Sequence, residues 1–335
     1  MATGSTRFTS RHRSTWIKLV LKALISLLIL VVAGVAITQW KAARNEARAE
    51  ASHPPPGQFI DVDGIKIHAL VTGNGPDLVM IHGSSGSTRD MSFALAPALT
   101  ERYRVILFDR PGHGFSDPLP RGRETINDQA RFLSAAAAQL GAKQPIVMGQ
   151  SYGGAVALAW AVQFPDRLSA LVPVSTPSTP WTTPLDPYYQ LVTSTFGNLL
   201  AVPLITAFVP DTRVEATMTE VFAPQAVPEG YLDHFNPRLS LRRSATRANA
   251  RQRANLLDEV TALYPRYPDI SVPTEILHGD ADDIVSPSLH SENLVTQIPG
   301  AVLTLLPGLG HMPQHVAVPD VVAAIDRAAA RAGLR

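Results

Sequence analysis

The chain has 335 residues, 45% of them hydrophobic, so it is long enough to form a large apolar core. Its formal charge is only +1, but the first 50 residues carry eight basic and two acidic groups, which leaves the remainder acidic. An acidic remainder excludes a general nucleic-acid binder, and the absence of cysteine excludes disulfides, a thiolate nucleophile and cysteine-ligated zinc.

The N-terminal part of the chain predicts a single membrane anchor. Residues 17–40 are long and apolar enough for a spanning helix, and Trp16 and Trp40 bracket them as interfacial aromatic side chains do. Residues 1–16 form a basic tail, which orients the N-terminus toward the cytoplasm and everything after the helix toward the periplasm or the cell exterior. Residues 41–56 are expected to be a linker. A cleaved signal peptide is the alternative, although the apolar segment is long for one.

From residue 57 onward, short apolar runs alternate with helical patterns. Strands are predicted at residues 58–62, 65–71, 77–82, 103–108, 145–149, 168–174, 273–278 and 301–306. Helices are predicted at residues 88–99, 124–140, 152–164, 287–298 and 318–331. This alternation indicates an α/β fold with a mostly parallel eight-stranded sheet, covered by helices on both faces and edged by an antiparallel hairpin.

A serine stands on a predicted sharp turn between a strand and a helix, in the segment Gly149-Gln150-Ser151-Tyr152-Gly153. This is the pattern of a nucleophile elbow, in which flanking glycines permit a bend where larger side chains would collide. We interpret Ser151 as a nucleophile. The alternative is a serine that only caps the following helix.

A serine hydroxyl becomes a strong nucleophile only when a base takes its proton and an acid orients that base. Both groups should follow Ser151 in the chain, the acid first. His311 follows the last predicted strand, and three carboxylates follow the strand before it: Asp280, Asp282 and Asp283. Loops at the ends of parallel strands meet at one sheet edge, so these groups should converge on the serine.

Together these motifs resemble the α/β-hydrolase superfamily, over roughly residues 57–335. Many members of that family carry their acid in a Gly-x-x-Asp-x-x-Val segment. Residues 279–285 match it with Asp282 in the acid position, which makes Asp283 the second choice and Asp280 the third. Relatives that dehalogenate or open epoxides carry aspartate at the elbow, so a serine there argues against both chemistries.

The same resemblance implies the groups that would hold an oxyanion. In the family, one backbone N–H comes from the residue after His-Gly and the other from the residue after the nucleophile, which correspond to Ser84 and Tyr152. Residues 109–117 resemble the family's D-x-P-G-x-G-x-S turn, which we interpret as structural.

The resemblance also implies a helical cap over residues 176–271, inserted between the core segments 57–175 and 272–335. Aromatic side chains of the cap could line an acyl pocket or form the core of the cap itself. Six arginines of the cap form either an anion- or lipid-binding rim or a solvated helix paired with acidic core surface: Arg238, Arg242, Arg243, Arg247, Arg251 and Arg253.

These observations predict a membrane-anchored serine hydrolase with the triad Ser151, Asp282 and His311, acting on a carboxylic ester with a small or medium apolar acyl group. The bond class stays open, because the cap selects the substrate. The alternatives are cleavage of carbon–carbon bonds in vinylogous diketones, cofactor-free haloperoxidase or perhydrolase chemistry, and amide cleavage. A non-catalytic ligand-binding protein on the same fold is the alternative from another class. No cofactor is expected, and no metal is expected either, because the Asp and His spacing lacks the glycine and final glutamate of an EF-hand and no H-E-x-x-H segment is present.

Overall fold

The computed structural model describes residues 8–335, with side chains from residue 15 onward, so residues 1–7 of the expected basic tail lie outside the described residues. An eight-stranded sheet runs through the domain in the order β1-β2-β4-β3-β5-β6-β7-β8. The first two strands form an antiparallel hairpin, β2 pairs antiparallel with β4, and every later pair is parallel. The strands are β1 Gln58–Val62, β2 Ile65–Thr72, β3 Asp77–Ile81, β4 Arg104–Phe108, β5 Ile146–Gln150, β6 Ala170–Val174, β7 Glu275–Gly279 and β8 Val302–Leu306.

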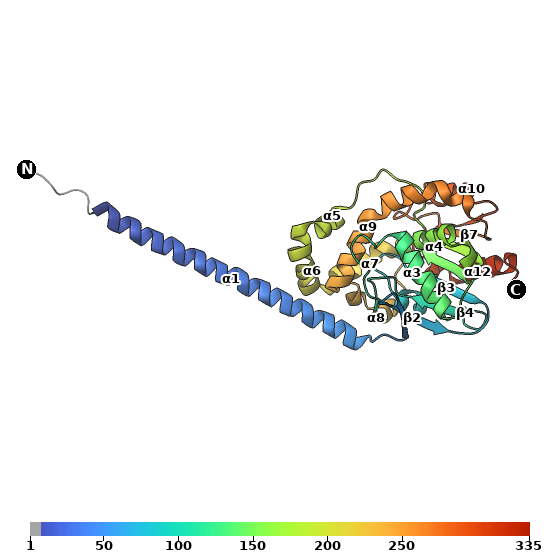
Figure 1. Ribbon diagram of the computed structural model, residues 1–335, viewed down its shortest axis with the longest axis horizontal. Helices are drawn as coiled ribbons and strands as arrows, with labels where there is room; N and C mark the ends of the chain where they lie inside the picture. The colour runs from blue at the N-terminus through green and yellow to red at the C-terminus, as the bar shows by residue number, and fades with distance from the viewer. Residues whose placement is uncertain (1–7) are drawn as a thin grey trace, which may run out of the picture.

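Helices cover both faces of this sheet, which confirms the predicted fold class (Figure 1). The central strands are apolar and buried on both sides, as expected for parallel strands between two helical layers. One layer contains α3 and α4, and the other contains α2 and α12. The helices outside the cap are α1 Phe8–Ser52, α2 Thr88–Phe93, α3 Ile126–Gln139, α4 Tyr152–Gln163, η1 Pro165–Arg167, α10 Ser291–Gln297, α11 Pro313–Val316 and α12 Val318–Arg331.

Residues between β6 and β7 form a helical cap over the carboxyl edge of the sheet. The cap helices are α5 Pro187–Thr193, η2 Gly197–Ala201, α6 Val202–Phe208, α7 Asp211–Phe222, α8 Tyr231–Phe235, η3 Pro237–Leu239, α9 Arg243–Leu263 and η4 Tyr264–Asp269. Helix α9 connects the outer cap helices with the buried core through Leu256 and Val260.

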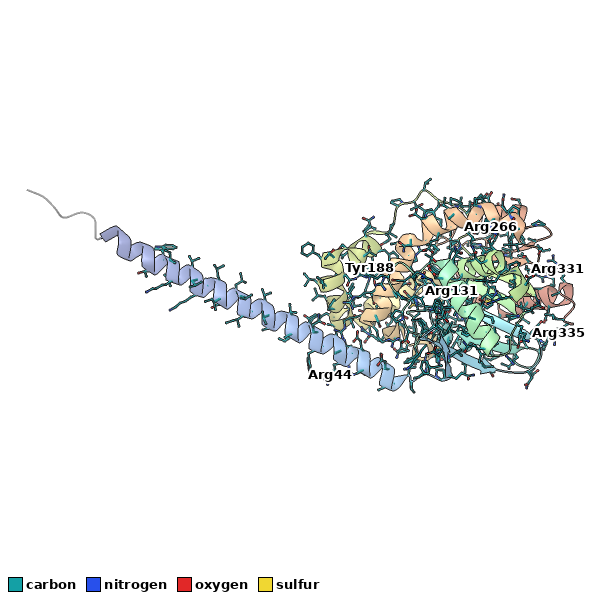
Figure 2. All side chains as sticks on the ribbon, in the orientation of Figure 1. Arg44, Arg131, Tyr188, Arg266, Arg331 and Arg335 are labelled. Carbon is teal, nitrogen blue, oxygen red and sulfur yellow. The ribbon has the colours of Figure 1, made fainter. Side chains whose placement is uncertain are left out.

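Helix α1 projects far beyond the domain (Figure 1). Its most apolar 18-residue window has a mean hydropathy of 2.8 and is 0% buried, so by length and composition it could cross a membrane. The helix first contacts the cap near Gln39, which accepts a hydrogen bond from Arg243, and Ala42 is fully buried. Figure 2 shows Arg44 where the helix reaches the domain.

Residues 41–56, expected as a linker, are helical as far as Ser52. Two acidic residues in this part of α1 pair with cap arginines: Glu46 with Arg243 and Glu50 with Arg242, each at 2.7 Å. The sequence expectation differed because the partners that bind these residues lie far along the chain.

The side chains of the six cap arginines contact other residues of the protein, and four of them pair with acidic side chains. Besides the two pairs with α1, Arg251 binds the buried carboxylate of Glu124 at 2.9 Å, Arg238 binds Asp211, and Arg247 binds Asn198. Arg253 stacks over the ring of Tyr189. Pairing with the protein's own acids accounts for most of the cluster, and part of that acidic surface belongs to α1 rather than to the core.

Candidate active site

Ser151 stands on a strained turn between β5 and α4. Its φ of 52° and ψ of −122° are unusual for a residue with a side chain, and strain of this kind gathers at functional sites. A Cβ at Gly149 would collide with the backbone oxygen of Gly153, and a Cβ at Gly153 with that of Ile81. Both glycines are therefore required for the turn, as the sequence pattern indicates.

His311 and Asp282 form a buried pair at the same edge of the sheet. His311 follows β8 and Asp282 follows β7, and His311 Nδ1 lies 2.7 Å from Asp282 Oδ2. Asp282 Oδ1 accepts backbone N–H groups from Ile284 and Val285, each at 2.9 Å. Burial alone would raise the pKa of Asp282, but hydrogen bonds from His278, His311 and the backbone hold it below its ordinary range. The carboxylate is thus charged and oriented toward the histidine.

The other two candidate acids lie elsewhere. Asp280 accepts the backbone N–H of Gly308 at 2.6 Å, and Asp283 is exposed. Within residues 15–335, Asp282 is the carboxylate that contacts the His311 ring. Of the three acids considered from the sequence, the first choice is thus the one that lies beside His311, and its role stays a prediction.

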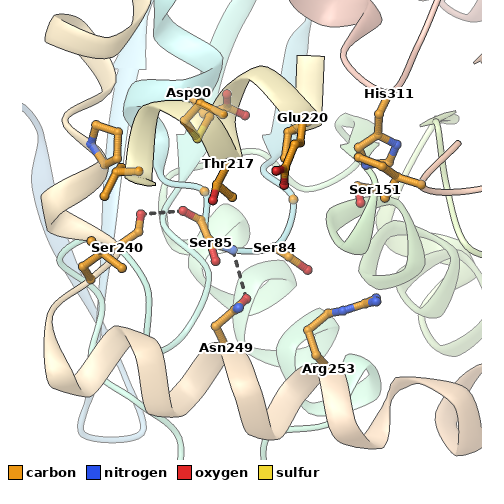
Figure 3. Close-up of a pocket in the computed structure, with 18 of the residues that line it drawn as sticks. Ser84, Ser85, Asp90, Ser151, Thr217, Glu220, Ser240, Asn249, Arg253 and His311 are labelled. Atoms are coloured by element: carbon orange, nitrogen blue, oxygen red, sulfur yellow. Dashed lines mark hydrogen bonds between the residues drawn. The ribbon is translucent and has the colours of Figure 1, made fainter. Parts of the chain in front are cut away.

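Ser151 and His311 line one pocket between the core and the cap, with a cavity volume of about 660 Å³ (Figure 3). Among the residues whose side chains are described, no hydrogen bond joins the serine hydroxyl to the His311 ring. Bonds between a nucleophile and its base are often long in unliganded sites and shorten when substrate binds. Ser84 and Arg253 face the cavity from the loop after β3 and from α9.

The loop after β3, residues 83–86, is attached to the cap. Ser85 N donates to Asn249 Oδ1 at 2.9 Å, and Ser240 donates its hydroxyl to the Ser85 carbonyl (Figure 3). Ser84 thereby lies across the cavity from α9, and Tyr152 begins α4 directly after the serine. Backbone N–H groups at a helix start are unpaired within the helix and can stabilise an anion.

Comparison with known families identifies the fold. The family model described as alpha/beta hydrolase fold matches residues 76–318. The chain belongs to the α/β-hydrolase family.

Curated relatives of this hydrolase-fold protein have different named activities. A pimeloyl-[acyl-carrier protein] methyl ester esterase of Nitrosomonas europaea is 28% identical, over 74% of this chain and 93% of the relative. A 2-hydroxy-6-oxononadienedioate/2-hydroxy-6-oxononatrienedioate hydrolase of Klebsiella pneumoniae is 29% identical, over 77% and 90%. Among solved structures, a membrane phospholipase A aligns with a TM-score of 0.63 and 23% identity, over 93% of this chain and 99% of that one. This last likeness concerns the fold alone.

Two buried residues, His278 and Arg110, hold the loops of the site in place, and the sequence analysis did not identify either of them as a site residue. His278 Nε2 lies 3.0 Å from Asp282 Oδ2 and 2.8 Å from the Val285 carbonyl oxygen. It donates to both oxygens and so holds the loop after β7, which carries Asp282. Arg110 donates to the carbonyls of His82 and Gly83 and lies 4.4 Å from the ring of Tyr152. Arg110 therefore supports the loop after β3 and the elbow together.

His82 has a structural role. It is fully buried; its Nε2 accepts the backbone N–H of Arg110 at 2.9 Å, and its Nδ1 donates to the Gly83 carbonyl. Burial, followed by the nearby charges of Arg110 and His113, places the pKa of His82 well below its ordinary value. His82 therefore stays neutral and braces the loop. Across the part of the chain that is described, no group of three or more His, Asp or Glu side chains is placed to hold a metal ion.

Proposed function

We propose that this protein is a membrane-anchored serine hydrolase that acts on a carboxylic ester. Ser151 is the nucleophile, His311 the general base and Asp282 the acid that orients it. The observation that carries the proposal is the 2.7 Å hydrogen bond that His311 Nδ1 donates to Asp282 Oδ2, because it turns the opposite ring nitrogen toward the pocket that Ser151 lines.

The reaction has two halves. Ser151 Oγ attacks the ester carbonyl while His311 Nε2 takes the hydroxyl proton, and His311 then passes that proton to the leaving alcohol. A water molecule, deprotonated by His311, then attacks the acyl carbonyl; the bond to Ser151 Oγ breaks, the acid leaves, and His311 returns the proton to Ser151 Oγ. The N–H groups of Ser84 and Tyr152 stabilise the negative oxygen of each tetrahedral intermediate.

The pocket walls favour an apolar acyl group. Ile205, Val209 and Val221 of the cap and Met312 beside the histidine line the cavity. The relative from Nitrosomonas europaea is named as an ester hydrolase, which supports ester cleavage. The relative from Klebsiella pneumoniae is named as the hydrolase of a dienedioate, so carbon–carbon cleavage is the second candidate.

A substrate panel tests the bond class. The full chain in detergent is assayed with p-nitrophenyl esters of increasing acyl length, beside a vinylogous diketone and a fluorophosphonate probe. We expect covalent labelling by the probe and turnover of esters, with little turnover of the diketone. Turnover of the diketone alone would reassign the bond class. An unlabelled, inactive protein would favour a non-catalytic binding function.

We also propose that α1 anchors the protein in a membrane as an uncleaved single span. The apolar residues 17–40 are exposed along the helix, and Lys18 and Lys22 stand at its start. The positive charges before the span favour an N-terminus in the cytoplasm, which would leave the hydrolase domain in the periplasm or outside the cell.

Fractionation tests this anchor. After expression of the full chain, we expect the intact protein to remain in the membrane pellet through an alkaline carbonate wash, because a spanning helix is released only by detergent. N-terminal sequencing should find the chain uncleaved. A shortened protein in the soluble fraction would instead identify residues 17–40 as a cleaved signal.

A further inference from the structure

The outer edge of the cap exposes an apolar surface. Phe196 is 79% exposed and Leu199 62% exposed, and four further large apolar side chains of the same segment are exposed. We call these six residues the cap patch: Leu191, Phe196, Leu199, Leu200, Leu204 and Phe208. They lie on α5, η2 and α6 and on the short turn between α5 and η2. Water-soluble surfaces seldom gather so many large apolar groups without a partner.

The cap patch lies next to the apolar helix. Asn45 of α1 donates to the carbonyl oxygens of Thr206 and Ala207 at 3.0 and 3.3 Å, and the Lys41 ammonium lies 4.2 Å from the ring of Phe208. Lys41 directly follows Trp40, the last residue of the apolar span. Phe208 is therefore at the level where a membrane-spanning α1 would enter the bilayer interface.

The orientation of the domain relative to α1 is set by several contacts. The ion pairs of Glu46 with Arg243 and of Glu50 with Arg242 join the helix to the start of α9. Figure 1 shows α5 and α6 on the side of the domain from which the rest of α1 projects, and Figure 2 places Tyr188 of α5 on that side. The cap patch consequently faces the layer that would surround residues 17–40.

We propose that the cap patch inserts into the interfacial region of the lipid bilayer that holds α1. This inference rests on the proposed anchor. Large apolar side chains are stabilised when they move from water into the bilayer interface, so six such groups together give a strong preference for contact with lipid. The same segments also line the active-site cavity through Tyr188, Tyr189 and Ile205. The pocket therefore shares a wall with the bilayer, and its substrates are amphiphiles that partition into lipid.

Single-site labelling tests the contact, since the native chain has no cysteine. Three full-chain variants carry a nitroxide in phosphatidylcholine–phosphatidylglycerol vesicles: Leu199→Cys in the cap patch, Leu28→Cys in the span and Lys143→Cys. Lys143 is exposed before β5, at the sheet edge opposite the cap. We expect the labels at 28 and 199 to be relaxed strongly by oxygen and weakly by a water-soluble nickel chelate. The label at 143 should show the reverse.

The outcomes separate this inference from the anchor. A lipid-exposed label at 28 with a water-exposed label at 199 overturns the inference and leaves the anchor standing. A label at 199 that is shielded from both reagents indicates that the cap patch contacts protein, such as a second copy of this chain. That result also overturns the inference. A water-exposed label at 28 refutes the anchor and the inference together.

A variant of the cap patch, at residues that do not line the pocket, tests whether substrates reach the active site from the lipid. Combined Phe196→Ser, Leu199→Ser and Leu200→Ser should reduce hydrolysis of a long-chain ester in vesicles several-fold. Turnover of p-nitrophenyl acetate should stay unchanged, because none of the three residues lines the cavity. Equal loss on both substrates, or on neither, contradicts the proposal. Leu305→Ser, at an exposed position on β8, is the matched control.

Discussion

Replacement of Ser151 by alanine is expected to lower kcat by about 10⁴–10⁶-fold and to abolish fluorophosphonate labelling. In the proposed reaction the hydroxyl oxygen of Ser151 is the atom that forms the bond to the acyl group, and this serine lines the same cavity as the His311 ring that Asp282 holds. Alanine keeps the Cβ, so the strain at a φ of 52° is unchanged and the fold should be retained. Ester turnover, probe labelling and thermal unfolding of the same preparation measure the effect.

Ser151→Gly is the matched control for strain. Glycine adopts positive φ without a steric penalty, so this variant should be as inactive as the alanine variant but more stable by about 1 kcal/mol. Ester turnover by either variant within tenfold of the wild-type rate would show that another residue is the nucleophile.

Replacement of Asp282 by asparagine is expected to lower kcat by about 10⁴-fold. Oδ2 of Asp282 contacts His311 and His278, and Oδ1 accepts two backbone N–H groups. An asparagine amide has one accepting oxygen, so one of these donor pairs must face an NH₂ group in either orientation. The variant should also lose about 1–3 kcal/mol of unfolding free energy, as measured by denaturant titration.

Asp283→Asn is the control for Asp282, because it makes the same chemical change at an exposed neighbour. Its rate should stay within tenfold of wild type and its stability within about 0.5 kcal/mol. If Asp283→Asn were the more damaging of the two, the acid would have to be reassigned.

The stability cost of Asp282→Asn should depend on pH. The pKa of Asp282 is lowered in the folded protein, so its carboxylate stabilises the fold at pH values above the unfolded pKa of about 4. That contribution is lost as the pH falls toward the folded pKa. The difference in unfolding free energy between wild type and variant should therefore shrink below about pH 4.

Much of the core could be predicted because its signals are local. The strands are short apolar runs, and the elbow needs only a strand, a serine and two glycines within five residues. The cap was predicted from the composition of residues 176–271, which breaks the strand–helix alternation. The supporting residues His278 and Arg110 were not predicted, since nothing near them in the sequence shows which buried oxygen each would face.

The sequence by itself determined the fold class, the elbow at Ser151 and the two loops that carry an acid and a histidine. Only the tertiary structure decided that Asp282 contacts His311, 29 residues away, and that α1 continues to Ser52. It also paired Glu46 with Arg243, 197 residues later. The physical reason is range: backbone conformation depends on near neighbours, whereas charge pairing and burial depend on segments that meet only after the chain has folded.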